Sequence, residues 1–482
     1  MGPAELSLQP WDPVSPQLAQ AHGNVFTVWV GPTPVVVLSG FRVVKEALVS
    51  NSEQFSGRPL TPLFRDLFGE RGKAALSAGN GGSSAAMGTR GGSRDASATL
   101  RELGLSKLAL ELQLQGEAAE LAEAFHQEQG RPFDLRVHIV TSTARVIGAL
   151  VFGRHFLLED PFFQELIQAI DFGLAFVSTI WRRLYDLFPW AFRRLPGPHQ
   201  EMFRYQKAVR GYICREINRH KLRTPEAHKD FISCYLAQIT KATDDPVSTF
   251  NEENLIQVVV DLFLGGTDTT ATTLCWALIY MVQHGAIQER VQQELDAVLG
   301  TSRAVRYEDR ERLPYTRAVL HEVQRLSSVV TAGAVRQCVT STRVHGHPVP
   351  KGTIILPNLA SVLYDPKYKD GNFLVNEAFL PFLPAGHRVS LGDQLARMEL
   401  FLMFATLLRT FWFQLPEGIP GLRLEYIFGG TRQPRPQKIC AVPHLNCPSP
   451  GPGEEGVWPM AGGGGGLETC PPQRPSLVSF GS

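Results

Sequence analysis

The sequence predicts a mainly α-helical fold with small β-sheets, and three observations support this prediction. The chain has 482 residues, of which 44% are hydrophobic and 19% charged, so it is long enough for a large packed core. Apolar residues recur at helical spacing from about residue 101 to 295. Short β-rich runs lie only before and after this helical region.

The elements follow in chain order. Two β-rich runs, 25–30 and 33–37, are split by Gly31-Pro32 and predict a hairpin. Helical spacing begins at Arg42. Apolar and aromatic periodicity predicts further helices over 134–152, 161–188, 252–281, 315–326 and 391–411, with strands within 343–355 and 422–428.

Composition separates one large domain, 23–443, from segments of different character. Residues 1–22 are irregular and rich in proline, and we expect no membrane anchor or secretion signal there. Residues 74–99 are rich in Gly, Ser and Ala, and we expect disorder because they bury too little apolar area to offset the cost of ordering. Residues 444–482 form a low-complexity tail rich in glycine and proline.

Charge and cysteine content exclude several classes of function. Lys and Arg together number 47 and Asp and Glu 46, so no cationic surplus predicts nucleic acid as a partner. The seven cysteines are odd in number and contain no C-x-x-C pair, which argues against a zinc site or a disulfide framework. A reducing compartment fits this pattern best.

The helix predicted over 252–281 has an unusual centre, Asp261-Leu262-Phe263-Leu264-Gly265-Gly266-Thr267-Asp268-Thr269-Thr270. Each buried glycine costs up to about 1 kcal/mol relative to alanine. Threonine hydroxyls can bond to backbone carbonyls and open the helix to water or a ligand. Asp268 and Thr269 then supply an acid and an alcohol on a proton path. Taken alone, the run is equally consistent with a kink or a close helix crossing.

Glu322 and Arg325 lie three positions apart on the predicted helix 315–326. At this spacing both side chains share one helix face and can pair. An exposed pair contributes no more than about 1 kcal/mol, so the spacing alone does not mark a functional site.

The loop 382–392 precedes the last predicted helix and ends in Arg388-Val389-Ser390-Leu391-Gly392. Arg388 can pair with an anion, and Gly392 permits a close backbone approach. The dipole of helix 391–411 would favour negative charge at Ser390. The alternative interpretation is an ordinary helix start with Ser390 as its N-cap.

The order and separation of these three features resemble those of the cytochrome P450 family. The stretch Phe382–Leu402, and Leu313-Pro314-Tyr315-Thr316 before the Glu322 helix, resemble microsomal family 2 members in particular. The resemblance covers residues 23–443, with interruptions at 74–99 and near 368–372. It implies the cytochrome P450 fold.

The resemblance also implies roles for the candidate residues. In the family a cysteine thiolate ligates the haem iron, and Ser390 occupies that position here. Asp268 and Thr269 match the residues that deliver protons to bound dioxygen. The haem contacts it implies are Arg336 and Arg388, which match propionate contacts, and Gly392 beside the ligand position.

Two further sets of residues follow from the resemblance. Glu322 and Arg325 match a buried structural pair behind the haem, and Phe263, Leu264 and the aromatic helix 161–188 would line the substrate pocket. The implied partners are a lipophilic small molecule, such as a drug, fatty acid or steroid, and an NADPH-cytochrome reductase. The implied location is the endoplasmic reticulum membrane; without an anchor, a cytoplasmic or peripheral location is the alternative.

The chain departs from the family pattern in several places. A neutral hydroxyl at Ser390 is a far poorer ligand than thiolate. The loop is one residue longer, since Phe382 and Gly386 are four positions apart where the family has three. A Trp-x-x-x-Arg helix would fall within 74–99. About a dozen residues are missing after Tyr368, which would leave Arg325 short of a partner at a cost of about 3–5 kcal/mol.

We therefore expect a protein of haem monooxygenase ancestry that is catalytically impaired or inactive and binds haem weakly or not at all. The alternative is an active haem-dependent monooxygenase despite Ser390.

Overall fold

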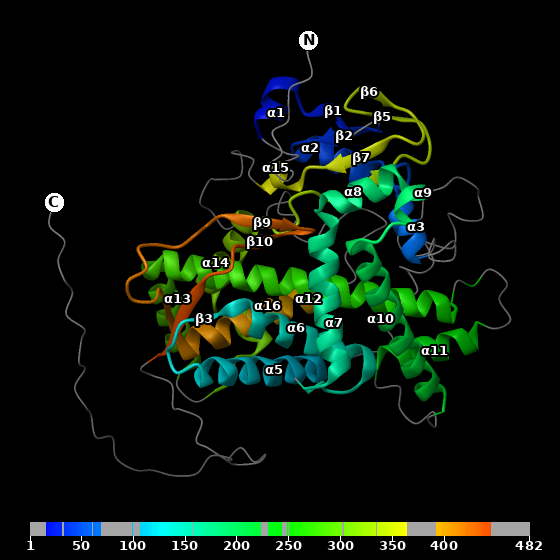
Figure 1. The fold of residues 1–482 in the computed structure, drawn as a ribbon. Helices are drawn as coiled ribbons and strands as arrows, with labels where there is room; N and C mark the ends of the chain where they lie inside the picture. The colour runs from blue at the N-terminus through cyan, green and yellow to red at the C-terminus, as the bar shows by residue number, and fades with distance from the viewer. Residues whose placement is uncertain are drawn as a thin grey trace, which may run out of the picture.

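Helices dominate the described part of the chain, as the sequence predicts, and small separate sheets flank them (Figure 1). The computed structural model describes residues 16–30, 33–59, 61–68, 99, 107–157, 159–222, 230–242, 248, 250–300, 303–333, 335–363 and 392–444. The expectations for 1–15, for disorder over 74–98, and for the tail after 444 lie outside these residues. The expectation of an irregular segment up to residue 22 is wrong for 16–22, which form the helix α1 (Pro16–His22), and Thr99, at the end of the stretch expected to be disordered, is buried.

The helices are α1 (Pro16–His22), α2 (Phe41–Lys45), η1 (Glu46–Ser50), α3 (Pro62–Phe68), α5 (Lys107–Gln127), α6 (Leu135–Phe152), α7 (Pro161–Val177), α8 (Ile180–Leu187), α9 (Pro189–Phe192), α10 (Pro198–Lys221), α11 (Phe231–Lys241), α12 (Glu252–Gln283), α13 (Gly285–Leu299), η3 (Tyr307–Glu311), α14 (Pro314–Ser327), α15 (Leu359–Leu363) and α16 (Asp393–Thr410).

The strands are β1 (Val25–Val30), β2 (Thr33–Leu38), β3 (Phe133–Asp134), β4 (Arg336–Gln337), β5 (Thr342–Val344), β6 (His347–Val349), β7 (Ile354–Pro357), β8 (Phe411–Gln414), β9 (Tyr426–Gly429), β10 (Thr431–Pro434) and β11 (Lys438–Pro443). They form sheets in the orders β1-β2-β7-β4, β3-β11-β8, β9-β10 and β5-β6. The predicted hairpin is confirmed, because β1 and β2 pair antiparallel from Val25 opposite Leu38.

The prediction of one helix over 161–188 is wrong, because α7 ends at Val177 and α8 begins at Ile180. Ser178 and Thr179 donate their hydroxyls back to the carbonyls of Ala175 and Phe176, both at 2.8 Å. The Thr179 hydroxyl then accepts from the Arg182 amide and caps α8. Short polar side chains that bond to the local backbone therefore divide the helix.

Local caps determine where the two helices of the candidate site begin. The Asn251 side chain accepts from the Asn254 amide at 2.8 Å at the start of α12. The Asp134 carboxylate accepts from the Arg136 amide at 2.9 Å at the start of α6, which ends at the left-handed Gly153. Both are ordinary N-caps, which satisfy amides that the helix itself leaves unpaired.

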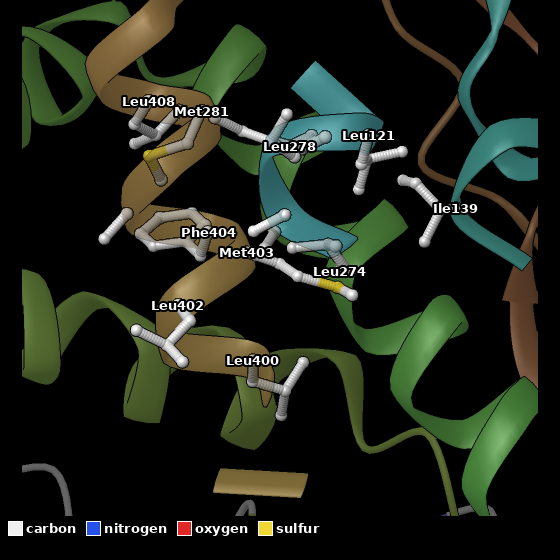
Figure 2. Close-up of a cluster of buried hydrophobic side chains, with 14 of the residues drawn as sticks. Leu121, Ile139, Leu274, Leu278, Met281, Leu400, Leu402, Met403, Phe404 and Leu408 are labelled. Atoms are coloured by element: carbon white, nitrogen blue, oxygen red, sulfur yellow. The ribbon is translucent and has the colours of Figure 1, made fainter. Parts of the chain in front are cut away.

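The main core gathers side chains from α5, α6, α12 and α16. Figure 2 shows Leu121, Ile139, Leu274, Met403 and Phe404 packed between these helices, and all are buried. The C-terminal half of α12 therefore lies inside the protein, which makes it a rigid support for the residues at its centre.

The helix α6 is long and apolar enough to cross a membrane, but 67% of its 18-residue window is buried inside the fold. Because α6 packs along α12 as a core element, this burial is typical of an internal helix in a globular domain.

Candidate functional site

The centre of α12 carries a break in an otherwise buried surface. Leu262 and Phe263 are buried, whereas Leu264 is 42% exposed and Gly265 is also exposed. One turn later, Thr269 is partly exposed. We call Leu264, Gly265 and Thr269 the open face of α12. An apolar side chain, a bare backbone and a hydroxyl there provide a contact surface for an apolar ligand with one polar group.

The two adjacent glycines of α12, Gly265 and Gly266, have different surroundings and therefore different roles. A Cβ on Gly266 would lie 2.5 Å from Cδ1 of Ile147 in α6, so this glycine permits a close helix crossing. A Cβ on Gly265 would meet no atom within 4 Å. The crossing alternative is therefore correct for Gly266, whereas Gly265 leaves backbone accessible on the open face.

The Thr269 hydroxyl donates to the Gly265 carbonyl at 2.6 Å, and the Thr273 hydroxyl donates to the Thr269 carbonyl at 2.8 Å. These are the threonine–carbonyl bonds expected from the sequence. The Thr269 oxygen keeps acceptor capacity beside the exposed backbone of Gly265.

Asp268 lies on the inner side of α12, with its side chain 2% exposed. Its carboxylate accepts from the Thr431 hydroxyl at 2.6 Å, from Gln433 Nε2 at 3.0 Å and from Arg136 Nη2 at 2.9 Å. Charge and hydrogen bonds therefore compensate the burial of this carboxylate.

The pair Glu322–Arg325 forms on α14 as predicted. Arg325 Nε and Nη2 donate to the two carboxylate oxygens of Glu322 at 2.7 and 2.6 Å. The Glu322 side chain is 53% exposed, so in this structure the pair is not buried. Arg325 Nη1 also donates to the Leu363 carbonyl at 3.3 Å, so Arg325 has a partner besides Glu322. The segment after Tyr368, on which the expectation of a missing partner depends, lies outside the described residues.

Of the other predicted site residues, the structure describes Arg336, Phe263 and Gly392. Arg336 is buried in β4, and Phe263 packs at 5.7 Å (ring centroids) against Phe152 in the core rather than on the open face. Ser390 and Arg388 lie outside the described residues. Gly392 is the N-cap of α16, which begins at Asp393, so the alternative with Ser390 as N-cap is wrong.

Three partners of Asp268 carry no signal in the sequence pattern. Arg136, Thr431 and Gln433 are separated from Asp268 by 132, 163 and 165 positions, and only the tertiary fold brings them together. Asp261 is different, because an acid within the apolar run before Leu264 is visible in the sequence. Burial raises the pKa of Asp261 to about 7, and Gln257 donates to its carboxylate at 3.0 Å.

A second buried acidic group lies where α16 crosses α5. Glu399 of α16 and Glu117 of α5 are each 1% exposed. Oε1 of Glu117 lies 3.1 Å from Nδ1 of His155, and Oε2 of Glu117 lies 3.9 Å from Nη1 of Arg145. Oε1 of Glu399 has no hydrogen-bond partner among the described residues. Burial, together with the charge of Glu117, raises the pKa of Glu399 well above the ordinary glutamate value.

Comparisons with known proteins agree with the mainly helical architecture. The sequence model of the family "Cytochrome P450" matches residues 10–441. Cytochrome P450 2J2 of Homo sapiens is 36% identical over 438 residues, covering 88% of this chain and 85% of the relative. Cytochrome P450 2J5 of Mus musculus is 38% identical over 443 residues, covering 89% and 86%. Cytochrome P450 2D6 of Homo sapiens is 38% identical over 444 residues, covering 89% and 88%. With matches of this extent, the chain belongs to the cytochrome P450 family of haem monooxygenases.

Proposed function

We propose that this protein is a cytochrome P450 whose monooxygenase activity is impaired or lost. The observation that carries the proposal is Ser390 at the position of the family's cysteine ligand. A serine hydroxyl is neutral at physiological pH and binds iron far more weakly than a thiolate does. The extra residue between Phe382 and Gly386 adds a change in loop length.

The residues present fit the haem only in part. The open face of α12 offers bare backbone at Gly265 and a hydroxyl at Thr269, and Arg336 supplies a buried cation. The donor at Ser390 does not fit, because the family's chemistry requires an anionic sulfur ligand. We therefore assign no reaction step through the haem, and propose that haem binds weakly or not at all.

In this proposal the α12 residues keep their ancestral positions. Thr269 is the group that would hold a proton at the open face, since its hydroxyl is partly exposed and anchored on Gly265. Asp268 is the neighbouring acid. Leu264 borders the apolar ligand from α12, with Phe263 behind it in the core. By the family resemblance, Arg388 and Gly392 belong to the haem contacts, and Gly392 is the N-cap of α16.

We further propose a lipophilic ligand, a reductase partner and a location at the endoplasmic reticulum membrane surface. Large apolar side chains on and between α8 and α9 are exposed, with Trp190 of α9 at 68% exposure and Phe188, between the helices, at 48%. In the sequence, Arg183 lies five positions before Phe188 and Arg194 four positions after Trp190. Exposed aromatic residues flanked by arginines are typical of a surface that rests in a membrane interface.

The test is whether the full chain, expressed with an adequate haem supply, carries haem through purification. We expect substoichiometric haem and no thiolate-type Soret shift in the reduced, carbon-monoxide-bound spectrum. Stoichiometric haem together with oxidation of a lipophilic probe would overturn the proposal.

A Ser390→Cys variant distinguishes the effect of the missing thiolate from the effect of the longer loop. We expect this single change not to restore the thiolate spectrum, because the loop keeps its extra residue. Deletion of Leu383 in the same variant is the matched comparison. Recovery of the spectrum in Ser390→Cys alone would show that the hydroxyl, and not the loop, is the whole defect.

The second candidate function is an active monooxygenase despite Ser390. The open face of α12, with Gly265 and Thr269 both accessible, favours it. The same measurements distinguish the two candidates, because activity requires retained haem.

A further inference from the structure

Arg136 of α6 forms ion pairs with two other helices, α7 and α12. Its Nη2 donates to Oδ1 of Asp171 in α7 at 2.7 Å and to Oδ1 of Asp268 in α12 at 2.9 Å. One guanidinium therefore serves two carboxylates from separate helices. The side chain of Asp268 is 2% exposed and that of Asp171 is 47% exposed, so the link runs from the interior to the surface.

Arg136 itself is firmly placed. Its backbone amide donates to the Asp134 carboxylate at 2.9 Å in the cap of α6. Burial opposes the charged form, but the charges of Asp268 and Asp171 outweigh it and raise the pKa of Arg136 above its ordinary value. The guanidinium is therefore a permanent cation at this position.

The hairpin of β9 and β10 also contacts Asp268 and α7. Thr431 and Gln433 of β10 donate to the Asp268 carboxylate at 2.6 and 3.0 Å. At the turn, Gly430 lies so close to α7 that an added Cβ would be 2.9 Å from Cδ2 of Leu174. The hairpin therefore contacts both α7 and the centre of α12.

The helix α7 runs across α12 (Figure 1), and apolar residues of both helices share one core cluster, including Leu166 and Ile170 of α7 and Leu262 of α12. Leu174, three positions after Asp171, packs against the same cluster. The polar link at Asp171 therefore adds an ion-pair link to α12 between apolar contacts on either side of it in α7.

We infer that Arg136 is a positioning residue that holds α7 in place relative to the open face of α12, and so limits the size of the lipophilic molecule that fits there. The size limit rests on the proposed function, because it presumes a ligand at the open face. The hold on α7 does not, because it depends only on ion pairs within the chain.

Hydrogen–deuterium exchange of the full chain tests the hold. We expect Arg136→Met to raise exchange about tenfold in residues 167–177, 265–273 and 426–434, since the variant loses the hydrogen bonds between charged groups that join Arg136 to Asp171 and Asp268. The control is Arg131→Met, an exposed arginine that donates only to Gln129 at 2.9 Å among its side-chain bonds described here.

Two milder variants distinguish positioning from general destabilisation and remain informative if Arg136→Met does not fold. Asp171→Asn should raise exchange in 167–177 only. Arg136→Lys should preserve exchange in 265–273, because one ammonium can pair with Asp268, but should still raise it in 167–177. Exchange that changes only in the first turn of α6, or an Arg136→Lys variant identical to the wild type, would overturn the inference.

Fluorescence titration with naphthalene and pyrene tests the size limit. The ratio of the pyrene Kd to the naphthalene Kd should fall severalfold in Asp171→Asn and in Arg136→Lys. Raised exchange with an unchanged ratio would refute the size limit. If the wild type binds neither probe, the proposed ligand site is refuted, and the exchange experiment still decides whether Arg136 holds α7.

Discussion

The centre of α12 and the crossing of α5 with α16 each bury a carboxyl group, but they treat it in opposite ways. Asp268 and Glu399 are both 1% exposed. Asp268 receives hydrogen bonds from Arg136, Thr431 and Gln433. Oε1 of Glu399 has no such donor among the described residues, and its ionisable neighbour Glu117 is another acid.

The two carboxyl groups differ in the elements that surround them. The donors to Asp268 come from α6 and β10. The ionisable neighbour of Glu399 of α16 is Glu117 of α5. A buried carboxylate is tolerable only with compensating donors, so among the described residues Glu399 is the less well compensated of the two carboxyl groups.

The largest effect is expected from Asp268→Asn. This change removes the charge that pairs with the buried Arg136, and breaking such a pair costs about 3–5 kcal/mol. Urea unfolding followed by circular dichroism measures the loss, with the exposed Glu308→Gln as control. A loss in the free energy of unfolding below about 1 kcal/mol would show that Asp268 contributes no more to stability than an exposed charge does.

Gly266→Ala and Gly265→Ala test the same helix by its packing. Alanine at 266 would press on Ile147 and should destabilise the protein by about 1–3 kcal/mol. Alanine at 265 meets open space and should stabilise the helix by up to about 1 kcal/mol. Thermal unfolding of the two variants measures both effects. Equal effects would contradict the conclusion that Gly266 lies at a close helix crossing and Gly265 lies on the open face.

Glu399→Gln should have the opposite sign to Asp268→Asn. A carboxyl whose pKa is raised by folding stabilises the protein below its unfolded pKa, and that stability is lost as the pH rises. The contribution of Glu399 to the free energy of unfolding should therefore fall as the pH rises above the ordinary glutamate value of 4.5, and the variant should be more stable than the wild type by about 1–2 kcal/mol at pH 8.

Unfolding curves over pH 5–8 measure this trend, with the exposed Glu417→Gln as control. An identical pH dependence in wild type and Glu399→Gln would show that Glu399 is compensated after all. It would also remove the contrast with Asp268.

The smallest effect is expected from Glu322→Gln. Because the Glu322 side chain is 53% exposed, water screens its ion pair with Arg325, and the loss should stay below about 1 kcal/mol. A loss of about 3 kcal/mol in urea unfolding would show that this pair is a buried structural element, as the family resemblance implies.

Local patterns predicted much of the fold. Apolar periodicity identified α12 and α14, and β-rich runs around Gly31-Pro32 identified the hairpin of β1 and β2, because these elements depend on neighbouring residues. The break at Ser178-Thr179 was missed, since helical periodicity continues through it and only the side-chain bonds to Ala175 and Phe176 reveal it.

The sequence by itself determined the family, the Gly-Gly-Thr-Asp-Thr-Thr run and the replacement at Ser390, because residue identity and spacing are readable along the chain. Only the tertiary structure decided that Gly266 serves a crossing while Gly265 stays open, and that Arg136 links Asp268 to Asp171. Side chains more than a hundred positions apart leave no periodic signal, and whether a buried charge finds a donor depends on how the helices pack.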